Sequence, residues 1–169
     1  MKASKVTLQR EVYRNDALKI ADWLEDEDII KYLNEHQNVS QGIKQILSRV
    51  QMPILTHLFN QNGTFFVIHE GQSKPIGFLR LVFREDEAEM VVVIGDKDKW
   101  GLGYGTDAVR QALHHAFFNW RVNKVIAKIN ELNHRSIRAF RKAGFKHEKK
   151  LACEHQYSIA IEDFIRKAA

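Results

Sequence analysis

Hydrophobic residues recur at two different spacings along the chain, and these spacings predict where helices and strands lie. Apolar residues three and four positions apart predict amphipathic helices, whereas short apolar or alternating runs between turn residues predict strands. In the first sixty residues the pattern predicts one strand and three helices, the last of them disturbed near Pro53. They are a strand over residues 6–12, a helix over 17–24 capped by Asn15 or Asp16, and helices over 28–33 and 40–58.

The rest of the chain is predicted to contain more strands than helices. Two apolar runs separated by a glycine-containing turn predict a β-hairpin, and Pro75 suits the start of its second strand, where no ladder N–H is needed. Gly144 suits the C-terminal cap of a short helix. Residues 85–89 are predicted as an acidic connection, and residues 162–169 carry no clear pattern. The predicted strands are 64–69, 75–83, 90–94, 124–129, 145–151 and 156–161, and the predicted helices are 108–120 and 136–142.

The composition is that of one globular domain. A length of 169 residues, with 44% hydrophobic and 28% charged residues, is ordinary for a single domain, and no linker or repeat divides the chain. We therefore predict one α/β domain over residues 1–169. No apolar run is long enough for a signal peptide or membrane span, and the lone Cys153 cannot form an internal disulfide, so a cytoplasmic protein without a membrane partner is expected.

The distribution of charged residues and the spacing of histidines argue against two classes of partner, nucleic acids and metals. The net charge is +5, but basic residues are scattered among acidic ones, which argues against a nucleic-acid partner and is explained equally well by an anionic ligand. His114 and His115 fall on the polar side of a predicted helix and are expected at the surface. The spacing of His134, His147 and His155 is not that of metal ligands, so no metal is predicted.

The central feature is the apolar run 90–94, followed by a polar loop and by Gly101, Gly103 and Gly105, which lead into a helix. The first N–H groups of a helix have no intrahelical partners, so a glycine turn at this point forms an anion site. Thr106 adds a hydroxyl that could cap the helix or donate to a phosphate. The glycine spacing fits neither a P-loop nor the dinucleotide fingerprint. A tight turn that uses glycine only for its backbone freedom is the alternative.

Two segments resemble the signatures of the GCN5-related N-acetyltransferases, the GNAT family. Residues 100–105, WGLGYG, resemble the acetyl-CoA pyrophosphate loop, usually Q/R-x-x-G-x-G/A, and residues 133–145, NHRSIRAFRKAGF, resemble the second signature. Trp100 at the first position is typical of the branch that acetylates ribosomal-protein N-termini, polyamines and some antibiotics. The resemblance is close from Gly63 onward and loose before it.

The resemblance implies a mixed, mostly antiparallel twisted sheet flanked by helices, with a central pair of strands that splay apart near Ile94 and Gly95. Backbone groups freed there would bind the pantetheine arm of acetyl-CoA, and one N–H would face the thioester oxygen as it becomes an oxyanion. Gly95 suits a bulge at this point. The implied acetyl-CoA contacts are Ile94, Gly95, Trp100, Gly101, Leu102, Gly103, Tyr104, Gly105, Thr106, Asn133 and Ser136.

The same resemblance implies that the N-terminal helix pair forms one wall of the acceptor pocket. Trp23, Tyr32 and His36 become candidates to line that pocket, and the acids at 26–28 could attract a cationic amine. The alternative is that Trp23 and Tyr32 are core aromatics and that the acids are a solvated helix start.

Acyl transfer to an amine requires a base, because the amine must lose a proton before it attacks the thioester. Strand alternation places Glu87 and Glu89 on one face; Glu89 is the preferred base and Glu87 a substrate contact, with a solvated turn as the alternative for both. Many relatives carry a tyrosine that protonates the leaving thiolate, but Phe140 occupies the matching position. Ser136 or Tyr104 could replace it.

The resemblance therefore implies an enzyme that moves the acetyl group of acetyl-CoA directly to a primary amine of a small molecule. A protein N-terminus is the alternative acceptor, and a CoA-binding regulatory module without turnover is the alternative function, which Phe140 keeps open. A monomer and a homodimer are both compatible with the sequence.

Overall fold

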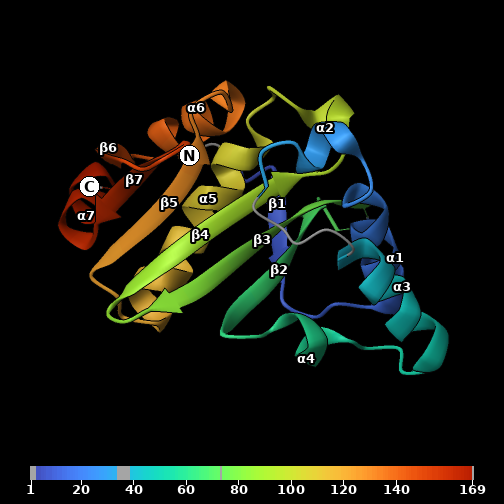
Figure 1. Ribbon diagram of the computed structural model, residues 1–169. Helices are drawn as coiled ribbons and strands as arrows, with labels where there is room; N and C mark the ends of the chain where they lie inside the picture. Colours follow the sequence, from blue (N-terminus) through green and yellow to red (C-terminus); the bar gives the residue numbers. More distant parts are fainter. Residues whose placement is uncertain (1–2, 34–38, 73, 169) are drawn as a thin grey trace.

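The structure, a computed structural model, describes residues 3–33, 39–72 and 74–168 of the chain. Its centre is a seven-stranded sheet in the order β1-β2-β3-β4-β5-β7-β6 (Figure 1). Neighbouring strands are antiparallel except β4 and β5, which run parallel, and this confirms the predicted mixed, mostly antiparallel sheet. The strands are β1 (Val6–Gln9), β2 (Gly63–Glu70), β3 (Lys74–Arg84), β4 (Glu87–Ile94), β5 (Lys124–Asn130), β6 (Lys146–Lys150) and β7 (Glu154–Ala160).

Helices cover both faces of the sheet, and each face has its own hydrophobic core. Ala108, Val109 and Leu113 of α5 are fully buried against one face, and Ile20 and Leu47, of α1 and α3, belong to the core on the other. In Figure 1, α1 and α3 lie to the right of the sheet and α5 lies behind β4 and β5. The helices are α1 (Arg14–Trp23), α2 (Glu27–Ile30), α3 (Val39–Arg49), α4 (Thr56–Phe59), α5 (Tyr104–His114), α6 (His134–Lys142) and α7 (Ile161–Ala168). None of them, in the described ranges, has the length and apolar character of a membrane span.

The two parallel strands β4 and β5 separate after a short paired segment. Only Glu87 to Glu89 of β4 pair with β5, although β4 continues to Ile94. Each strand stays in register with its antiparallel neighbour, β4 with β3 as far as Ile94 and β5 with β7 as far as Asn130. Because these neighbours hold the two strands on diverging courses, a wedge opens between them, and the predicted splayed strand pair is confirmed (Figure 1).

The predicted irregularity at Ile94 and Gly95 lies at the end of β4. The β3–β4 ladder is regular to Ile94, and the N–H groups of Gly95 and Asp96 then both donate to the Ile76 carbonyl, at 2.8 and 3.1 Å. Two residues thus oppose one, as in a bulge. A Cβ at Gly95 would lie 2.2–2.4 Å from ring atoms of Trp23, so glycine is required here because the indole of α1 packs flat against the backbone.

Gly95→Ala is expected to lower the free energy of unfolding by about 2–3 kcal/mol, because the Trp23 ring is only 6% exposed and cannot move aside. For a chain of this size that corresponds to a melting temperature about 5–10 °C lower, measurable by calorimetry. Gly42→Ala on α3 is the control, since its Cβ would meet nothing within 4 Å. Equal melting temperatures for the two variants would contradict this packing.

Several predicted boundaries in the N-terminal third are wrong. The first strand ends at Gln9 instead of continuing to Val12, whose N–H donates to the Thr56 hydroxyl at 3.0 Å. The first helix begins at Arg14, so its N-cap is Tyr13 and not Asn15 or Asp16. Asp16 is the third residue of the helix, and its carboxylate accepts the Tyr13 N–H. The helix predicted over 40–58 is two helices, since α3 ends at Arg49 and α4 covers Thr56–Phe59. The predicted helix over 28–33 is the shorter α2.

Later in the chain, three further predictions are corrected. The acidic residues 85–89 do not form a connection. A turn at residues 85–86 joins β3 to β4, and Glu87 and Glu89 lie in β4. The helix before Trp120 is α-helical to His114 and then forms a π-helical turn, η2 (His115–Asn119). The uninformative tail contains α7, which buries Phe164.

Candidate active site

The wedge between β4 and β5 opens into a cavity of about 300 Å³. Its walls are the second half of β4, the glycine loop that begins α5, the exposed side of α6, and residues of α2 and the turn after it. This cavity brings together most of the residues that the sequence predicted for acetyl-CoA and one predicted for the acceptor. These are Ile94, Trp100, Gly101, Gly103, Tyr104, Gly105, Thr106, Asn133, Ser136 and Tyr32.

The glycine loop presents backbone to this cavity. Gly101 and Gly103 adopt left-handed φ values of +74° and +88°, and Gly103 is the N-cap of α5. A Cβ would meet nothing within 4 Å at Gly101 and only the Lys5 ammonium, at 3.6 Å, at Gly103. The N–H groups of residues 104–106 open the helix and have no acceptor within it. The loop therefore fits an anion such as a diphosphate.

Contacts with Glu70 hold the glycine loop in place. The carboxylate of Glu70 accepts the Tyr104 hydroxyl at 2.7 Å and pairs with Lys99 at 2.8 Å. The bond from Lys99, and to a smaller extent the bond from Tyr104, lowers the pKa of Glu70. The bond to Glu70 raises the pKa of Tyr104. Because the pKa of Glu70 is lowered, its contacts stabilise the loop fully at any pH above the ordinary pKa of glutamate. This stabilisation is lost as the pH falls through the lowered pKa of Glu70. Leu102 points its carbonyl to Lys5, at 2.6 Å, and does not line the cavity.

Tyr104→Phe is expected to leave the alkaline limb of the pH profile of kcat unchanged. The Tyr104 hydroxyl donates to Glu70 and stabilises the glycine loop, so it should not be the proton donor to the thiolate. Loss of one hydrogen bond should weaken CoA binding by less than about 10-fold. Titration calorimetry with CoA and a kcat profile from pH 6 to about 11 check both parts, because the pKa of Tyr104 is raised above the ordinary tyrosine value of about 10. A variant that loses the alkaline limb, or most of its kcat, would identify Tyr104 as the proton donor instead.

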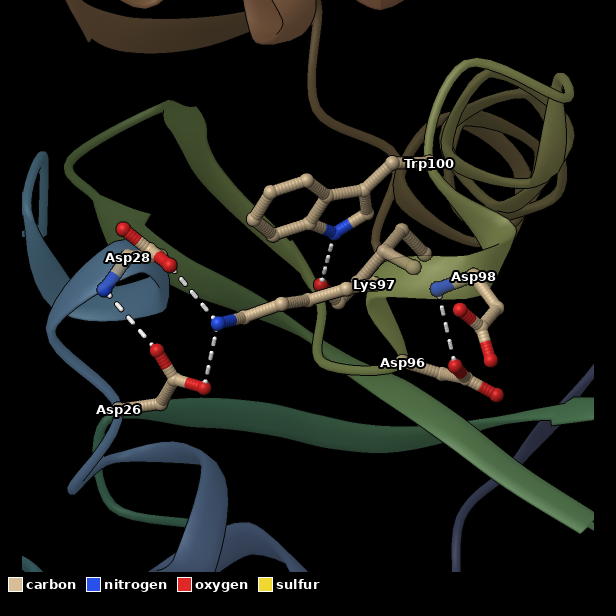
Figure 2. A network of polar contacts seen from close by, with 7 residues as sticks. Asp26, Asp28, Asp96, Lys97, Asp98 and Trp100 are labelled. Carbon is tan, nitrogen blue, oxygen red and sulfur yellow. Dashed lines mark hydrogen bonds and ion pairs between the residues drawn. The ribbon is translucent and has the colours of Figure 1, made fainter.

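The acids at the start of α2 are bound by a lysine. Lys97 pairs with Asp26 and Asp28, at 2.8 Å each, and Asp26 also caps α2 by accepting the Asp28 N–H at 3.0 Å (Figure 2). The bond from Lys97 lowers the pKa of Asp26, and the two acids raise the pKa of Lys97. These carboxylates were expected to attract a cationic amine, but they fasten α2 to the loop after β4. Asp96 caps the turn η1 (Lys97–Lys99) by accepting the Asp98 N–H.

Trp100 and Arg135 bridge the cleft from opposite walls. The indole N–H of Trp100 donates to the Ile94 carbonyl at 2.7 Å, which fixes the ring beside the end of β4 (Figure 2). The guanidinium carbon of Arg135, from the first turn of α6, lies 3.4 Å from the centroid of that ring. Burial lowers the pKa of Arg135 from its high ordinary value. Sequence reasoning missed Arg135, although its place between Asn133 and Ser136 in the second signature was a signal.

Helix α6 completes the wall opposite β4. Asn133 caps it by accepting the Ser136 N–H at 3.3 Å, and Ser136 lines the cavity. A Cβ at Gly105 would lie 3.9 Å from that of Ala139, so the starts of α5 and the middle of α6 approach closely. Phe140 is 2% exposed and packs edge-to-face on Phe145.

The remaining predicted residues lie outside the cavity lining. Glu89 sits at the last paired position of β4 and β5, with Arg84 at 2.9 Å and Lys128 at 3.7 Å from its oxygens. Glu87 pairs with Lys124 at 3.2 Å. Gly95 and Trp23 pack against each other at the end of β4, and Trp23 is a core residue. The acceptor and base roles of these residues stay predictions, and His36 lies outside the described residues.

The histidines give one correction. His115 is not a surface residue: its ring packs edge-to-face on Phe66, at 5.2 Å between centroids, and burial lowers its pKa. His147 and His155 are brought together, at 2.8 Å between ring nitrogens, by the β6–β7 pairing, which their spacing alone did not reveal. In the part of the chain that the structure describes, no three histidine, cysteine or acidic side chains gather as a metal site.

Comparison with known proteins agrees with this geometry. The family model described as an acetyltransferase (GNAT) domain matches residues 7–146. An uncharacterized N-acetyltransferase, p20, from Bacillus licheniformis is 24% identical over 142 residues, which is 82% of this chain and 78% of that protein.

Solved structures share the fold at low identity. A spermidine N-acetyltransferase from Vibrio cholerae, in complex with CoA and spermine, is 18% identical with a TM-score of 0.78, over 96% of this chain and 99% of that one. An aminoglycoside acetyltransferase in complex with coenzyme A is 18% identical with a TM-score of 0.79, over 97% and 99% of the two chains. With the family model covering most of its length, the chain belongs to the GNAT acetyltransferase family.

Proposed function

We propose that this protein transfers the acetyl group of acetyl-CoA to a primary amine of a small molecule by direct attack of the amine on the thioester. The observation that carries the proposal is the wedge between β4 and β5, which ends in an open glycine loop at the start of α5. A wedge between strands exposes unpaired backbone groups to a pantetheine arm, and the loop faces the diphosphate. The spermidine and aminoglycoside enzymes that share the fold also support an amine acceptor.

The residues present fit CoA at each part of the cleft. The free N–H groups at the start of α5 would hold the diphosphate, and Arg138 and Lys142, on the α6 wall, add positive charge at the same end of the cavity. Asn133 and Ser136 begin α6 beside the splayed strand and would contact the pantetheine amides. Bound there, CoA supplies the activated acetyl group, and a backbone N–H of β4 near Ile94 would stabilise the developing oxyanion.

Glu89 is the base in this proposal, and it would accept the proton of the amine directly or through water. It lies where the wedge closes, at the end of the paired segment, and its side chain is 13% exposed. Arg84 and Lys128 fix the carboxylate in position. With phenylalanine at 140, the thiolate would take its proton from Ser136 or from water.

Release of free thiol from acetyl-CoA with a panel of acceptors tests the proposal. Turnover with small amines and not with N-terminal peptides supports it, and the opposite result would establish the protein N-terminus as the acceptor. Tight CoA binding without thiol release from any acceptor would instead establish a CoA-binding module, the second function, which the buried Phe140 favours.

A further inference from the structure

Arg135 is a cleft cation that meets no carboxylate among residues 3–33, 39–72 and 74–168 at ion-pair distance. In contrast, Lys99 is paired with Glu70 and Lys97 with the acids of α2. A guanidinium stays charged at all working pH values, so one held in a cleft without an acidic neighbour is suited to an anion that arrives with a ligand.

Arg135 lies nearer the start of α6 than the residue that approaches the α5 end of the glycine loop. Ala139 is the α6 residue that approaches Gly105, at 3.9 Å for the Cβ that Gly105 lacks, and Arg138 and Lys142 flank Ala139. Arg135 lies about 6 Å further toward the start of α6, at 1.5 Å of rise per residue. Tyr32, a residue predicted for the acceptor, lines the same cavity and interacts electrostatically with Arg135.

Stacking on Trp100 fixes how Arg135 can bind. The guanidinium carbon is 3.4 Å from the ring centroid, so the face of the guanidinium is used by the indole and its N–H edge stays available. A fixed planar edge with parallel N–H groups matches the two oxygens of a carboxylate. Trp100 is itself held by its bond to the Ile94 carbonyl, so the edge has a defined place beside the end of β4.

Asp26 and Asp28 are not partners of Arg135, because both pair with Lys97. A polycation would have to displace Lys97 from Asp26 and Asp28 and would be repelled by Arg135. An amine that also carries a carboxylate could instead pair that carboxylate with Arg135. We propose that Arg135 binds a carboxylate of the acceptor and that the acceptor is a small aminocarboxylate such as a free amino acid. This inference rests on the proposed acetyl transfer and names its substrate class.

Acceptor pairs that differ only by a carboxylate test it: lysine with cadaverine, and ornithine with putrescine. For the wild-type protein, thiol release should give a kcat/KM at least about 10-fold higher for the carboxylate member of a pair. Arg135→Gln should abolish this preference and leave the KM for acetyl-CoA within about 3-fold, while Arg135→Lys, which keeps the charge but not the planar edge, should retain part of it.

Arg138→Gln is the matched control on the same wall of α6. Because Arg138 is next to Ala139 at the diphosphate end, this variant should raise the KM for acetyl-CoA and keep the preference for carboxylate acceptors. A higher kcat/KM for the decarboxylated members, or no acetylation of any aminocarboxylate, would overturn the inference. So would an Arg135→Gln variant that raises the KM for acetyl-CoA and slows both members of a pair equally. Turnover of polyamines alone would defeat this inference and spare the proposed function, whereas absence of CoA binding by calorimetry would defeat both.

Discussion

Gly103→Val should weaken CoA binding by about 100-fold while the domain stays folded. The backbone at Gly103 has φ +88°, a conformation that a β-branched residue adopts only at a cost of about 2–3 kcal/mol, and 1.4 kcal/mol is tenfold in affinity. Relief of that strain would rotate the peptide groups that open α5 away from the cleft, and retention of the conformation would place two methyl groups where the diphosphate must approach. Titration calorimetry with CoA measures the effect.

Gly71→Val separates the loss of the site from the loss of stability. Gly71 has φ +62°, and its Cβ would meet nothing within 4 Å, so the substitution introduces a comparable backbone strain. It lies in the β2–β3 turn and does not line the cleft. Both variants should melt at a similarly lowered temperature, but only Gly103→Val should lose CoA affinity. A folded Gly103→Val protein with wild-type affinity would eliminate the loop as the diphosphate site.

The sequence was most informative where one local pattern determines both structure and chemistry. The strand ending at Ile94, the glycine loop and the helix after it form a continuous segment, and the structure places them around one cavity. Hydrophobic periodicity likewise located the β2–β3 hairpin and the alternating residues that form the two cores. These features depend on neighbours in the chain, so a pattern over a few residues suffices to predict them.

Features that depend on distant residues were not predictable in this way. The pairing of Lys97 with Asp26 and Asp28 joins segments separated by about seventy positions in the chain. The bond between Tyr104 and Glu70 joins segments about half as far apart. The stacking of Arg135 on Trp100 depends on α6 and the glycine loop facing each other. Each of these contacts joins segments that are far apart in the chain, so no pattern over a few residues could predict it.

The second large effect is expected at Glu89. Glu89→Gln should lower kcat by about 100-fold near pH 7, because the amide has the size and hydrogen-bonding acceptor of the carboxylate but cannot take a proton. Near pH 10 a primary amine is increasingly unprotonated without assistance, so the difference from wild type should shrink there. The kcat profile of both proteins with one small-amine acceptor measures this convergence, which mere loss of the contacts with Arg84 and Lys128 would not produce.

Glu87→Gln distinguishes the base from its neighbour on the same strand face. Both residues lie in β4 and both pair with a basic side chain, but Glu89 occupies the last position before the strands diverge and Glu87 the first position of the paired segment. At 3.3 Å per residue, Glu87 lies about 7 Å further from the open wedge than Glu89, so an amine placed for proton transfer to Glu89 would be too far from Glu87. Its substitution should therefore change kcat by less than about 3-fold at any pH. Equal losses in the two variants would mean that the ion pairs serve the sheet and that the amine loses its proton to solvent.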